Sequence, residues 1–393
     1  MKSVKIVIGA NFGDEGKGLM TNYFTSQSEN PLVVRFNGGA QAGHTVIKDG
    51  KRFIFSHFGS GTLAGAPTYF AEEFICNPLL FNKEYDELVA AGVKIPDHWF
   101  HPNCQVTTPF DIIINREIEQ FRGIKRHGSC GIGIQETWKR SKVFPISIKD
   151  LNNTELLWVQ MEQIRDHWIQ QRADSLGLTT KLPDLCYDDH IIEGFIRDCE
   201  KFKERIVGIS DYKVFNYHDD IIFEGAQGLL LDQYSKYFPY VTPSSTGLEN
   251  VVKILKEFDP VPTEVIYLTR CYLTRHGAGP LETECPMPYP DIVDLTNQPN
   301  EWQQSLRFGL LDVNLLRETI DKDYKQALPY FEKSLGITCL DQTKEHYIFM
   351  DNYKVYFVED ELLNIMKILF QPKNLYTSHS ADGLRIKVNP TNL

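Results

Sequence analysis

The sequence has no hydrophobic run that approaches the ~18 apolar residues needed to cross a bilayer, so no membrane partner is expected. It also has no block of five or six lysines and arginines, and its formal net charge is −11. A nucleic-acid polymer is therefore not expected as a partner, because phosphate backbones are bound through clustered basic side chains. A basic pocket for one nucleotide remains compatible with an acidic chain, since local groups set the potential there.

Cysteines are present but are not arranged for metal binding. The eight cysteines contain no CxxC pair and no four-cysteine metal spacing, which favours reduced thiols in a reducing compartment. The amino-terminal residues pass from the apolar run VKIVIGA straight into a polar glycine-rich loop. This is not the pattern of a signal peptide. We therefore expect a cytoplasmic protein.

Short apolar runs alternate with helical patterns along the chain, which predicts an α/β fold with a mostly parallel central β-sheet. The strand candidates are Val4–Ile8, Leu32–Phe36, Asp220–Glu224, Thr263–Leu268, Tyr347–Phe349 and Val355–Phe357. A helix is expected at Gly18–Ser26, and Asp49-Gly50 between two β-prone runs predicts a hairpin. No repeat or Pro/Ser-rich linker marks a boundary. We expect a single large domain over residues 1–393, with a largely helical insertion at about 80–215.

Three glycine-rich loops follow predicted strands: GANFGDEGKG, NGGAQAGHT and FEGAQGLLLD. Glycine lets the backbone approach a ligand closely and adopt positive φ, and the carboxyl ends of parallel strands are where α/β folds bind ligands. The loops therefore favour a phosphate-bearing ligand. The spacing GxxxxGK[ST] is absent, which argues against a P-loop NTPase or kinase.

The first two loops also carry groups for chemistry. A carboxylate repels phosphate, but Mg²⁺ takes carboxylate and phosphate oxygens together, so Asp14 is a candidate metal ligand or general base. Lys17 is a candidate for neutralising a terminal phosphate, and His44 for stabilising an oxygen that gains charge. Structural alternatives remain open: Asp14 as a helix N-cap, Lys17 as a solvated lysine and His44 as a structural histidine.

Four motifs together carry a family resemblance. GDEGKG, NGGAQAGHTV, FEGAQGLLLD…FPYVTPSST and TRHGAGPLETE, in this order over about residues 9–284, resemble the adenylosuccinate synthetase family. The family phosphorylates the 6-oxygen of a purine nucleotide with a nucleoside triphosphate, and the amine of L-aspartate then displaces that phosphate. The resemblance implies a C–N ligase with a purine nucleoside monophosphate, L-aspartate and a nucleoside triphosphate as substrates, and usually a homodimer.

The resemblance also implies the catalytic roles. Asp14 would remove the purine N1 proton and hold Mg²⁺ together with the backbone carbonyl of Gly43. His44 would be the acid near the 6-oxygen, and Lys17 would stabilise the terminal phosphate of the triphosphate. Gln227 would meet the 6-oxygen.

The remaining positions are carried over from the family's motifs. The implied substrate-binding residues are Asn11, Gln41, Ser129, Cys130, Arg140, Thr242, Ser305 and Arg307. The implied nucleotide-binding residues are Gly13, Glu15, Gly16, Gly18, Thr45, Arg275, Asp341, Ser378 and Ser380. Arg140 is the candidate for the arginine that reaches the partner subunit's nucleotide phosphate, and Arg307 is the candidate partner of the aspartate carboxylate, since guanidinium binds carboxylate bidentately.

The chain departs from the usual family pattern at three places. Ser305 lies at or near an arginine that normally also meets the ribose 2′-hydroxyl. Cys339 replaces a lysine of the base site while Asp341 remains, and a carboxylate accepts from guanine or from an adenine amine. Asn22 stands where the family usually has an aspartate behind the catalytic histidine.

These departures resemble a viral and archaeal-like branch, some of whose phage members aminate dGMP with ATP or dATP. The hypothesis from sequence is therefore a dGMP-specific ligase. The alternatives are an ordinary adenylosuccinate synthetase that uses IMP and GTP, and a non-catalytic nucleotide-binding module.

Overall fold

A ten-stranded sheet forms the centre of the computed structural model, in the order β18-β17-β14-β11-β1-β10-β2-β5-β7-β9. The structure describes residues 1–178, 182–285, 292, 294, 305–342, 347–351, 353–357 and 359–391. Neighbouring strands of this sheet are parallel, except that β18 pairs antiparallel with β17. The strands are β1 (Ser3–Gly9), β2 (Pro31–Arg35), β5 (Thr68–Phe70), β7 (His98–Phe100), β9 (Gly208–Ile209), β10 (Asp220–Gly228), β11 (Thr263–Arg270), β14 (Phe331–Thr338), β17 (Asn374–Thr377) and β18 (Lys387–Pro390).

Strand β1 lies at the centre of the sheet and is covered by apolar side chains on both faces. Ile6 and Ile8 lie in the main hydrophobic core, whereas Val7 points to the other face and packs with Leu19 and Met20 of helix α1 (Lys17–Ser26). A strand buried on both faces needs a continuous apolar run rather than an alternating one. The predicted mostly parallel α/β architecture is confirmed, as are the expected strand and helix at the amino-terminal end.

A second sheet has the order β12-β13-β15-β16 and comprises β12 (Tyr272–Arg275), β13 (Arg307–Asp312), β15 (Tyr347–Asp351) and β16 (Tyr353–Phe357). The strand candidates at 347–349 and 355–357 belong to this sheet and not to the central one. The predicted hairpin is present as β3 (His44–Lys48) and β4 (Lys51–Phe55), with positive φ at Asp49 and Gly50. Two short strands, β6 (Ile75–Cys76) and β8 (Gln105–Val106), also pair.

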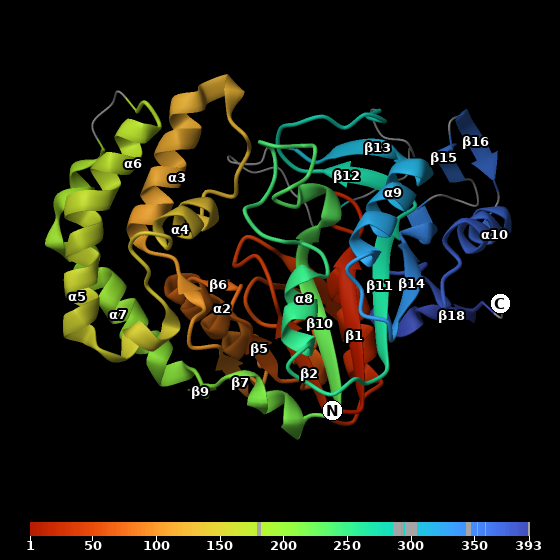
Figure 1. Ribbon diagram of the computed structural model, residues 1–393, viewed down its shortest axis with the longest axis horizontal. Coiled ribbons are helices and arrows are strands. Elements are labelled where there is room, and N and C mark those ends of the chain that lie inside the picture. Colours follow the sequence, from red (N-terminus) through yellow and green to blue (C-terminus); the bar gives the residue numbers. More distant parts are fainter. Residues whose placement is uncertain are drawn as a thin grey trace.

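Most helices of the middle of the chain gather on one side of the molecule (Figure 1). They are α2 (Pro78–Ala90), α3 (Pro109–Arg122), α4 (Ile134–Arg140), α5 (Thr154–Gln163), α6 (Ile169–Ser175) and α7 (Asp189–Arg205). They enclose a hydrophobic core that also contains Phe70 and Phe100 of β5 and β7, so they cover that end of the sheet. Helix α3 begins with a capping box between Thr108 and Asp111 and a proline at its first turn, which fixes its start.

The other helices, α8 (Glu249–Leu255), α9 (Val313–Tyr324) and α10 (Glu359–Phe370), lie towards the β1 and β11 side of the sheet (Figure 1). Within the described residues, the structure has no helix of the length and hydrophobicity that a membrane crossing requires.

Asp323 in α9 holds the start of α8. Its carboxyl group accepts hydrogen bonds from the Tyr267 hydroxyl (2.7 Å) and from the backbone N–H of Leu248 (3.0 Å). Burial raises the pKa of Asp323 to about 6, although these hydrogen bonds act in the opposite direction. The ionised form is therefore disfavoured in the folded state.

We predict that Asp323→Asn changes the pH dependence of stability. In the wild-type protein the raised pKa means that stability is lost as the pH rises from about 4 to 6, because the folded state binds the proton more tightly. The free energy of unfolding of the variant, relative to wild type, should improve by about 2–3 kcal/mol between pH 4 and pH 7. Urea denaturation at several pH values measures this. Asp321→Asn, an exposed position on the same helix, is the control, and a pH-independent difference for Asp323→Asn would contradict the assignment.

Candidate functional site

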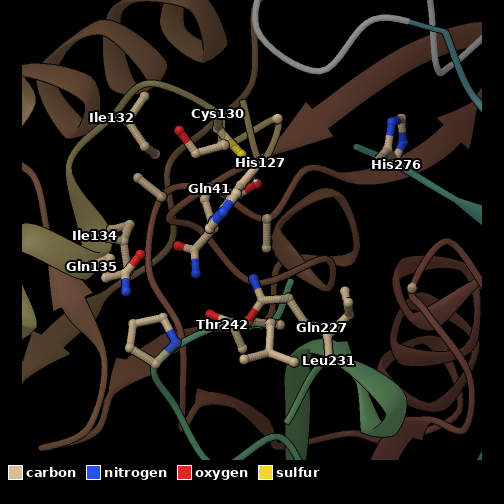
Figure 2. A pocket seen from close by; sticks show the side chains of 18 of the residues that line it. Gln41, His127, Cys130, Ile132, Ile134, Gln135, Gln227, Leu231, Thr242 and His276 are labelled. Carbon is tan, nitrogen blue, oxygen red and sulfur yellow. Dashed lines mark hydrogen bonds between the residues drawn. The ribbon is translucent and has the colours of Figure 1, made fainter. Parts of the chain in front are cut away.

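A cavity of about 590 Å³ lies where the loops after β1, β2 and β10 meet the hairpin β3–β4 and the helices of the middle segment. The side chains of Gln41 and Gln227 and that of Thr242 face one central space within it (Figure 2). The structure brings thirteen of the predicted site residues to its wall. These are Gly13, Asp14, Gly16, Lys17, Gly18, Gln41, Gly43, His44, Thr45, Ser129, Cys130, Gln227 and Thr242.

The loop after β1 is held by its own glutamate. Glu15 Oε1 accepts from the backbone N–H groups of Asn11 (3.0 Å) and Gly13 (2.8 Å), and its Oε2 accepts from Lys17 Nζ (3.0 Å). Glu15 and Lys17 are 2% and 3% exposed. The interpretation of Lys17 as a solvated lysine is therefore wrong. The Glu15 carboxylate is turned into the loop, so its contribution to the site is structural.

Asp14 projects from this loop with a positive φ of 63°. Its Oδ2 lies 3.0 Å from His276 Nε2, and its backbone carbonyl accepts from Arg270 Nε at 2.5 Å. Burial acts to raise the pKa of Asp14, but the hydrogen bond from His276 and the charges of His276, Arg270 and Lys17 lower it to about 2. The group is ionised at neutral pH. The N-cap of α1 is Gly16, with no side-chain cap, so the N-cap interpretation of Asp14 is wrong.

His44 at the start of β3 is paired with a carboxylate that the sequence analysis did not single out. Its Nδ1 lies 2.7 Å from Oε1 of Glu224, in the middle of β10. Glu224 also accepts from the backbone N–H of Ser60 (3.0 Å) and from the Ser60 hydroxyl. Burial opposes ionisation of Glu224, but His44, Arg35 and Ser60 lower its pKa to about 2. The ionised carboxylate accepts a hydrogen bond from Nδ1–H and so orients the ring.

Asn22 of α1 stands where an aspartate was expected behind the histidine, and Glu224 supplies a carboxylate in its place. The carboxylate behind the histidine comes from β10 rather than from α1. The pKa of His44 is lowered by burial, while the negative charge of Glu224 acts to raise it. From sequence, the motif FEGAQG was of interest for its glycines and its glutamine. The structure shows that its glutamate, Glu224, contacts His44.

Two amides in the cavity have no protein partner among the described residues. The side-chain nitrogen and oxygen atoms of Gln41 and Gln227 are all buried and make no hydrogen bond there. A Cβ at Gly38 would lie 2.9 Å from Gln227 Oε1 and 2.6 Å from Ala226 Cβ, so glycine is needed for this close approach. Buried amides without partners are costly. They are suited to a ligand that presents both donors and acceptors, as the edge of a purine does.

The opposite wall of the cavity is a loop from the middle segment, held by Glu119 of α3. Its Oε2 accepts from the backbone N–H groups of Gly128 (2.8 Å) and Ser129 (3.3 Å). The hydroxyl of Ser129 accepts from Asn115 Nδ2 at 3.0 Å. Burial raises the pKa of the Cys130 thiol to about 11, so the thiol is neutral at physiological pH. Glu119, like Glu224, was missed by the sequence analysis.

The predicted base site lies beside this cavity, outside its lining residues. Leu340, after β14, donates its backbone N–H to the carbonyl of Ser378, after β17 (3.1 Å), and the Thr338 hydroxyl donates to the carbonyl of Glu15 (3.2 Å). Asp341 is exposed, and Ser378 donates to the carbonyl of Ser380. The carboxyl end of β14 thus contacts the loop after β1, and the carboxyl end of β17 contacts the residues after β14.

Two predicted arginines, Arg140 and Arg275, do not line the cavity, contrary to the expectation from sequence. Arg140 is 0% exposed and is paired with Asp111 (Nε to both carboxylate oxygens, 3.0 Å), so it cannot reach a ligand of a partner subunit from this position. Arg275 is buried against the rings of Phe12 and Tyr237. Both guanidinium groups are bound within the protein.

The other predicted residues outside the cavity wall are Asn11, Ser305 and Arg307. Asn11 is buried and donates from Nδ2 to the Thr269 hydroxyl (2.9 Å), and Ser305 is exposed. The Arg307 guanidinium is held by Glu284 (2.8 and 2.5 Å) and by the carbonyl of Gly279 (2.7 Å). A substrate carboxylate would have to displace Glu284 to bind it.

The fold and the cavity define an α/β protein in which loops at the strand ends form the wall of one large cavity. The model of the family described as adenylosuccinate synthetase matches residues 6–330, and the adenylosuccinate synthetase of Microcystis aeruginosa is 32% identical over 285 residues. The chain belongs to the adenylosuccinate synthetase family. The match to the Microcystis protein covers 71% of this chain and 62% of that protein.

Two solved structures share the fold. Adenylosuccinate synthetase from Plasmodium falciparum, fully ligated, superposes with a TM-score of 0.72 at 18% identity and covers 98% of this chain and 99% of its own. The succinoaminodeoxyadenylate synthetase of cyanophage S-2L, bound to dGMP and dATP, has a TM-score of 0.59 at 15% identity and covers 100% and 96%. At sequence identities of 18% and 15%, the two structures support only the assignment of the fold.

The correction of Arg140 gives a prediction about stability. Arg140→Met leaves the buried Asp111 carboxylate without its partner and should lower the free energy of unfolding by about 3–5 kcal/mol. Lys142→Met is the control, because Lys142 is exposed and lies over the ring of Trp138. Its effect should stay within about 0.5 kcal/mol. Chemical denaturation measures both, and equal stability of Arg140→Met and wild type would show that the buried pair is not structural.

Proposed function

We propose that the protein is a C–N ligase that joins L-aspartate to C6 of a 6-oxopurine nucleoside monophosphate and consumes a nucleoside triphosphate. The observation that carries the proposal is that Asp14 and Lys17 of the loop after β1 and His44 of β3 line one cavity together with the unpaired amides of Gln41 and Gln227. Family membership supports the same reaction class. A binding module would have no use for an ionised carboxylate and a carboxylate-oriented histidine at one wall.

In this reaction the protein binds and orients three substrates. Gln227 and Gln41 would hold the purine edge by hydrogen bonds. Asp14, ionised and next to the cavity, would accept the N1 proton, so that the 6-oxygen gains negative charge and attacks the terminal phosphorus of the triphosphate. His44, protonated on both ring nitrogens and paired with Glu224 through Nδ1, would donate from Nε2 to the transferred oxygen atoms as they gain charge. The aspartate amine then attacks C6, and phosphate leaves with the former 6-oxygen.

Lys17 lies at the cavity before any nucleotide binds. Its ammonium group is bound to Glu15 and lines the cavity, where it would meet the terminal phosphate. An anionic phosphate competes for the same ammonium that Glu15 holds. The buried glutamate therefore keeps Lys17 in place before the nucleotide arrives, which reduces the ordering needed on binding.

Mg²⁺ fits the donor groups of this wall. The described residues contain no cluster of three or more His, Cys, Asp or Glu side chains suited to a metal, and Mg²⁺ commonly takes one carboxylate with waters and phosphate oxygens. Asp14 and the backbone carbonyl of Gly43 would hold the ion. When bound, it would neutralise charge on the phosphates.

The first prediction for this function concerns phosphate release. Release should require the purine monophosphate, L-aspartate and the nucleoside triphosphate together, and Asp14→Asn should lower kcat by about 100-fold or more because the proton acceptor is lost. Asp49→Asn is a matched control, since Asp49 also has a positive φ (52°) but lies in the β3–β4 turn. Phosphate release without aspartate would point to a hydrolase, and near-normal turnover of Asp14→Asn would remove Asp14 from the mechanism.

We further propose that the preferred monophosphate is dGMP, with ATP or dATP as the phosphoryl donor, and that the working form is a cytoplasmic homodimer. Ser305 supports the deoxynucleotide, because a serine replaces a guanidinium expected near the ribose 2′-hydroxyl and is exposed here. Cys339 in place of a base-site lysine supports a change of triphosphate. The phage protein of the same fold was solved with dGMP and dATP.

Assays with dGMP, GMP, dIMP and IMP test separately the two features of dGMP, which are the missing 2′-hydroxyl and the 2-amino group. At equal concentrations, kcat/KM should rank dGMP above GMP, which tests the 2′-hydroxyl, and dGMP above dIMP, which tests the 2-amino group. Each is assayed with ATP and with GTP, and IMP is the fourth substrate. Ser305→Arg should narrow the difference between GMP and dGMP. A preference for IMP with GTP would identify an ordinary adenylosuccinate synthetase and leave the ligase proposal intact.

A further inference from the structure

Residues 276–279, the 276 loop, follow β12 and reach the cavity wall next to the loop after β1. His276 lines the cavity, on the side away from Gln41 (Figure 2). Its Nε2 lies 3.0 Å from Asp14 Oδ2. Because an ionised carboxylate only accepts, Nε2 carries the proton in this contact. One oxygen of Asp14 is thereby occupied by the protein, and the other remains for the cavity.

The position of His276 is set by its neighbour in the chain. Arg275 lies 4.4 Å from the ring centroid of Phe12 and donates to the carbonyls of Pro280 (2.7 Å) and Tyr240 (3.1 Å). Burial lowers the pKa of Arg275 to about 10, yet the side chain stays charged at neutral pH. This arginine anchors the start of the 276 loop, which gives it a structural role in place of the predicted nucleotide contact.

The 276 loop also contacts the middle segment across the cavity. The backbone N–H of Ala278 donates to the carbonyl of His127 (3.1 Å). Gly277 and Gly128 both have positive φ, and a Cβ at Gly128 would lie 2.7 Å from the Gly277 Cα. Two glycines are therefore required at this crossing. The loop that presents Ser129 and Cys130 and the loop that contacts Asp14 are joined directly.

The backbone of Asp14 is strained, and contacts with Arg270 and His276 hold the residue in place. A non-glycine residue at φ 63° occupies a sparsely populated region. Arg270 fixes its carbonyl, and His276 fixes its carboxylate. A carboxylate without the second contact would be free to rotate towards Lys17 or Arg270. Proton transfer depends on placement to a fraction of an ångström, so loss of orientation lowers the rate of reaction more than it lowers affinity.

We propose that His276 is a positioning residue: it holds the Asp14 carboxylate towards the cavity and couples it, through the Gly277–Gly128 crossing, to the loop that carries Ser129 and Cys130. The inference rests on the proposed ligase function and deepens it. It assigns a role to a residue for which the four family motifs implied none.

The test compares His276→Leu with His276→Gln. His276→Leu removes the donor and should lower kcat by about 10- to 100-fold while the KM for the purine monophosphate changes by less than about twofold. His276→Gln keeps an N–H donor and should recover kcat to within about threefold of wild type. His190→Leu is the matched control, because His190 forms a histidine–carboxylate pair with Glu193 on the exposed face of α7.

A readout that does not require turnover separates this inference from the function. In protein labelled with ¹⁵N-histidine, the imidazole signals of His276 should shift in Asp14→Ala, while those of His190 stay unchanged. If wild type forms no aspartate-dependent phosphate, the proposed function fails, and the ¹⁵N shifts still report on the contact. Unchanged His276 signals overturn the positioning role. So does a kcat of His276→Leu within threefold of wild type, or equal loss of kcat in His276→Leu and His276→Gln.

Discussion

A carboxylate that is removed from water must collect hydrogen-bond donors, and here the donors are backbone N–H groups of the loops around one cavity. Glu15 binds the loop after β1, Glu119 binds residues 127–129, and Glu224 binds Ser60 and His44. Glu84 on α2 similarly accepts from the N–H groups of residues 56–58. Each charge fixes a loop that would otherwise have several conformations. Each of the four buried acids thus holds a loop at or beside the cavity in place.

This arrangement explains how the loop after β1 tolerates positive φ at Gly13, Asp14 and Gly16. Glycine adopts positive φ without strain, so the conformational cost, of order 1–3 kcal/mol, falls on Asp14. The three contacts of Glu15 and the two of Asp14 offset this cost. The same contacts separate two roles among acids that are adjacent in the chain. Glu15 faces the loop and supports it, whereas Asp14 faces the cavity and is available to a ligand. Adjacent carboxylates can differ in this way because the αL turn directs their side chains apart.

Local patterns were sufficient to predict β1, α1, the β3–β4 hairpin and the glycine-rich loops, because runs, turns and caps depend on nearby residues. The partner of His44 was not predictable in this way. Glu224 lies 180 positions away, and the parallel pairing of β10 with β2, the strand that precedes His44, brings the two residues together. Arg140 was misassigned for a related reason, since a pattern of basic residues does not reveal which of them meets a buried acid such as Asp111. Contacts of long sequence separation need the fold.

The cavity lies where two hydrophobic cores meet along one sheet. β1, β2 and β10 supply apolar side chains to the first core, whereas Phe70 and Phe100 of β5 and β7 pack with the helices of the middle segment. Apolar packing within each core does not determine how the loops above them meet, because those loops are polar. Directional contacts do so, among them the Ala278–His127 hydrogen bond and the close approach of two glycines. A ligand that binds Gln227 on one side and Ser129 on the other adds a further contact across the same boundary, and this is why a site for a multi-part ligand is best placed there.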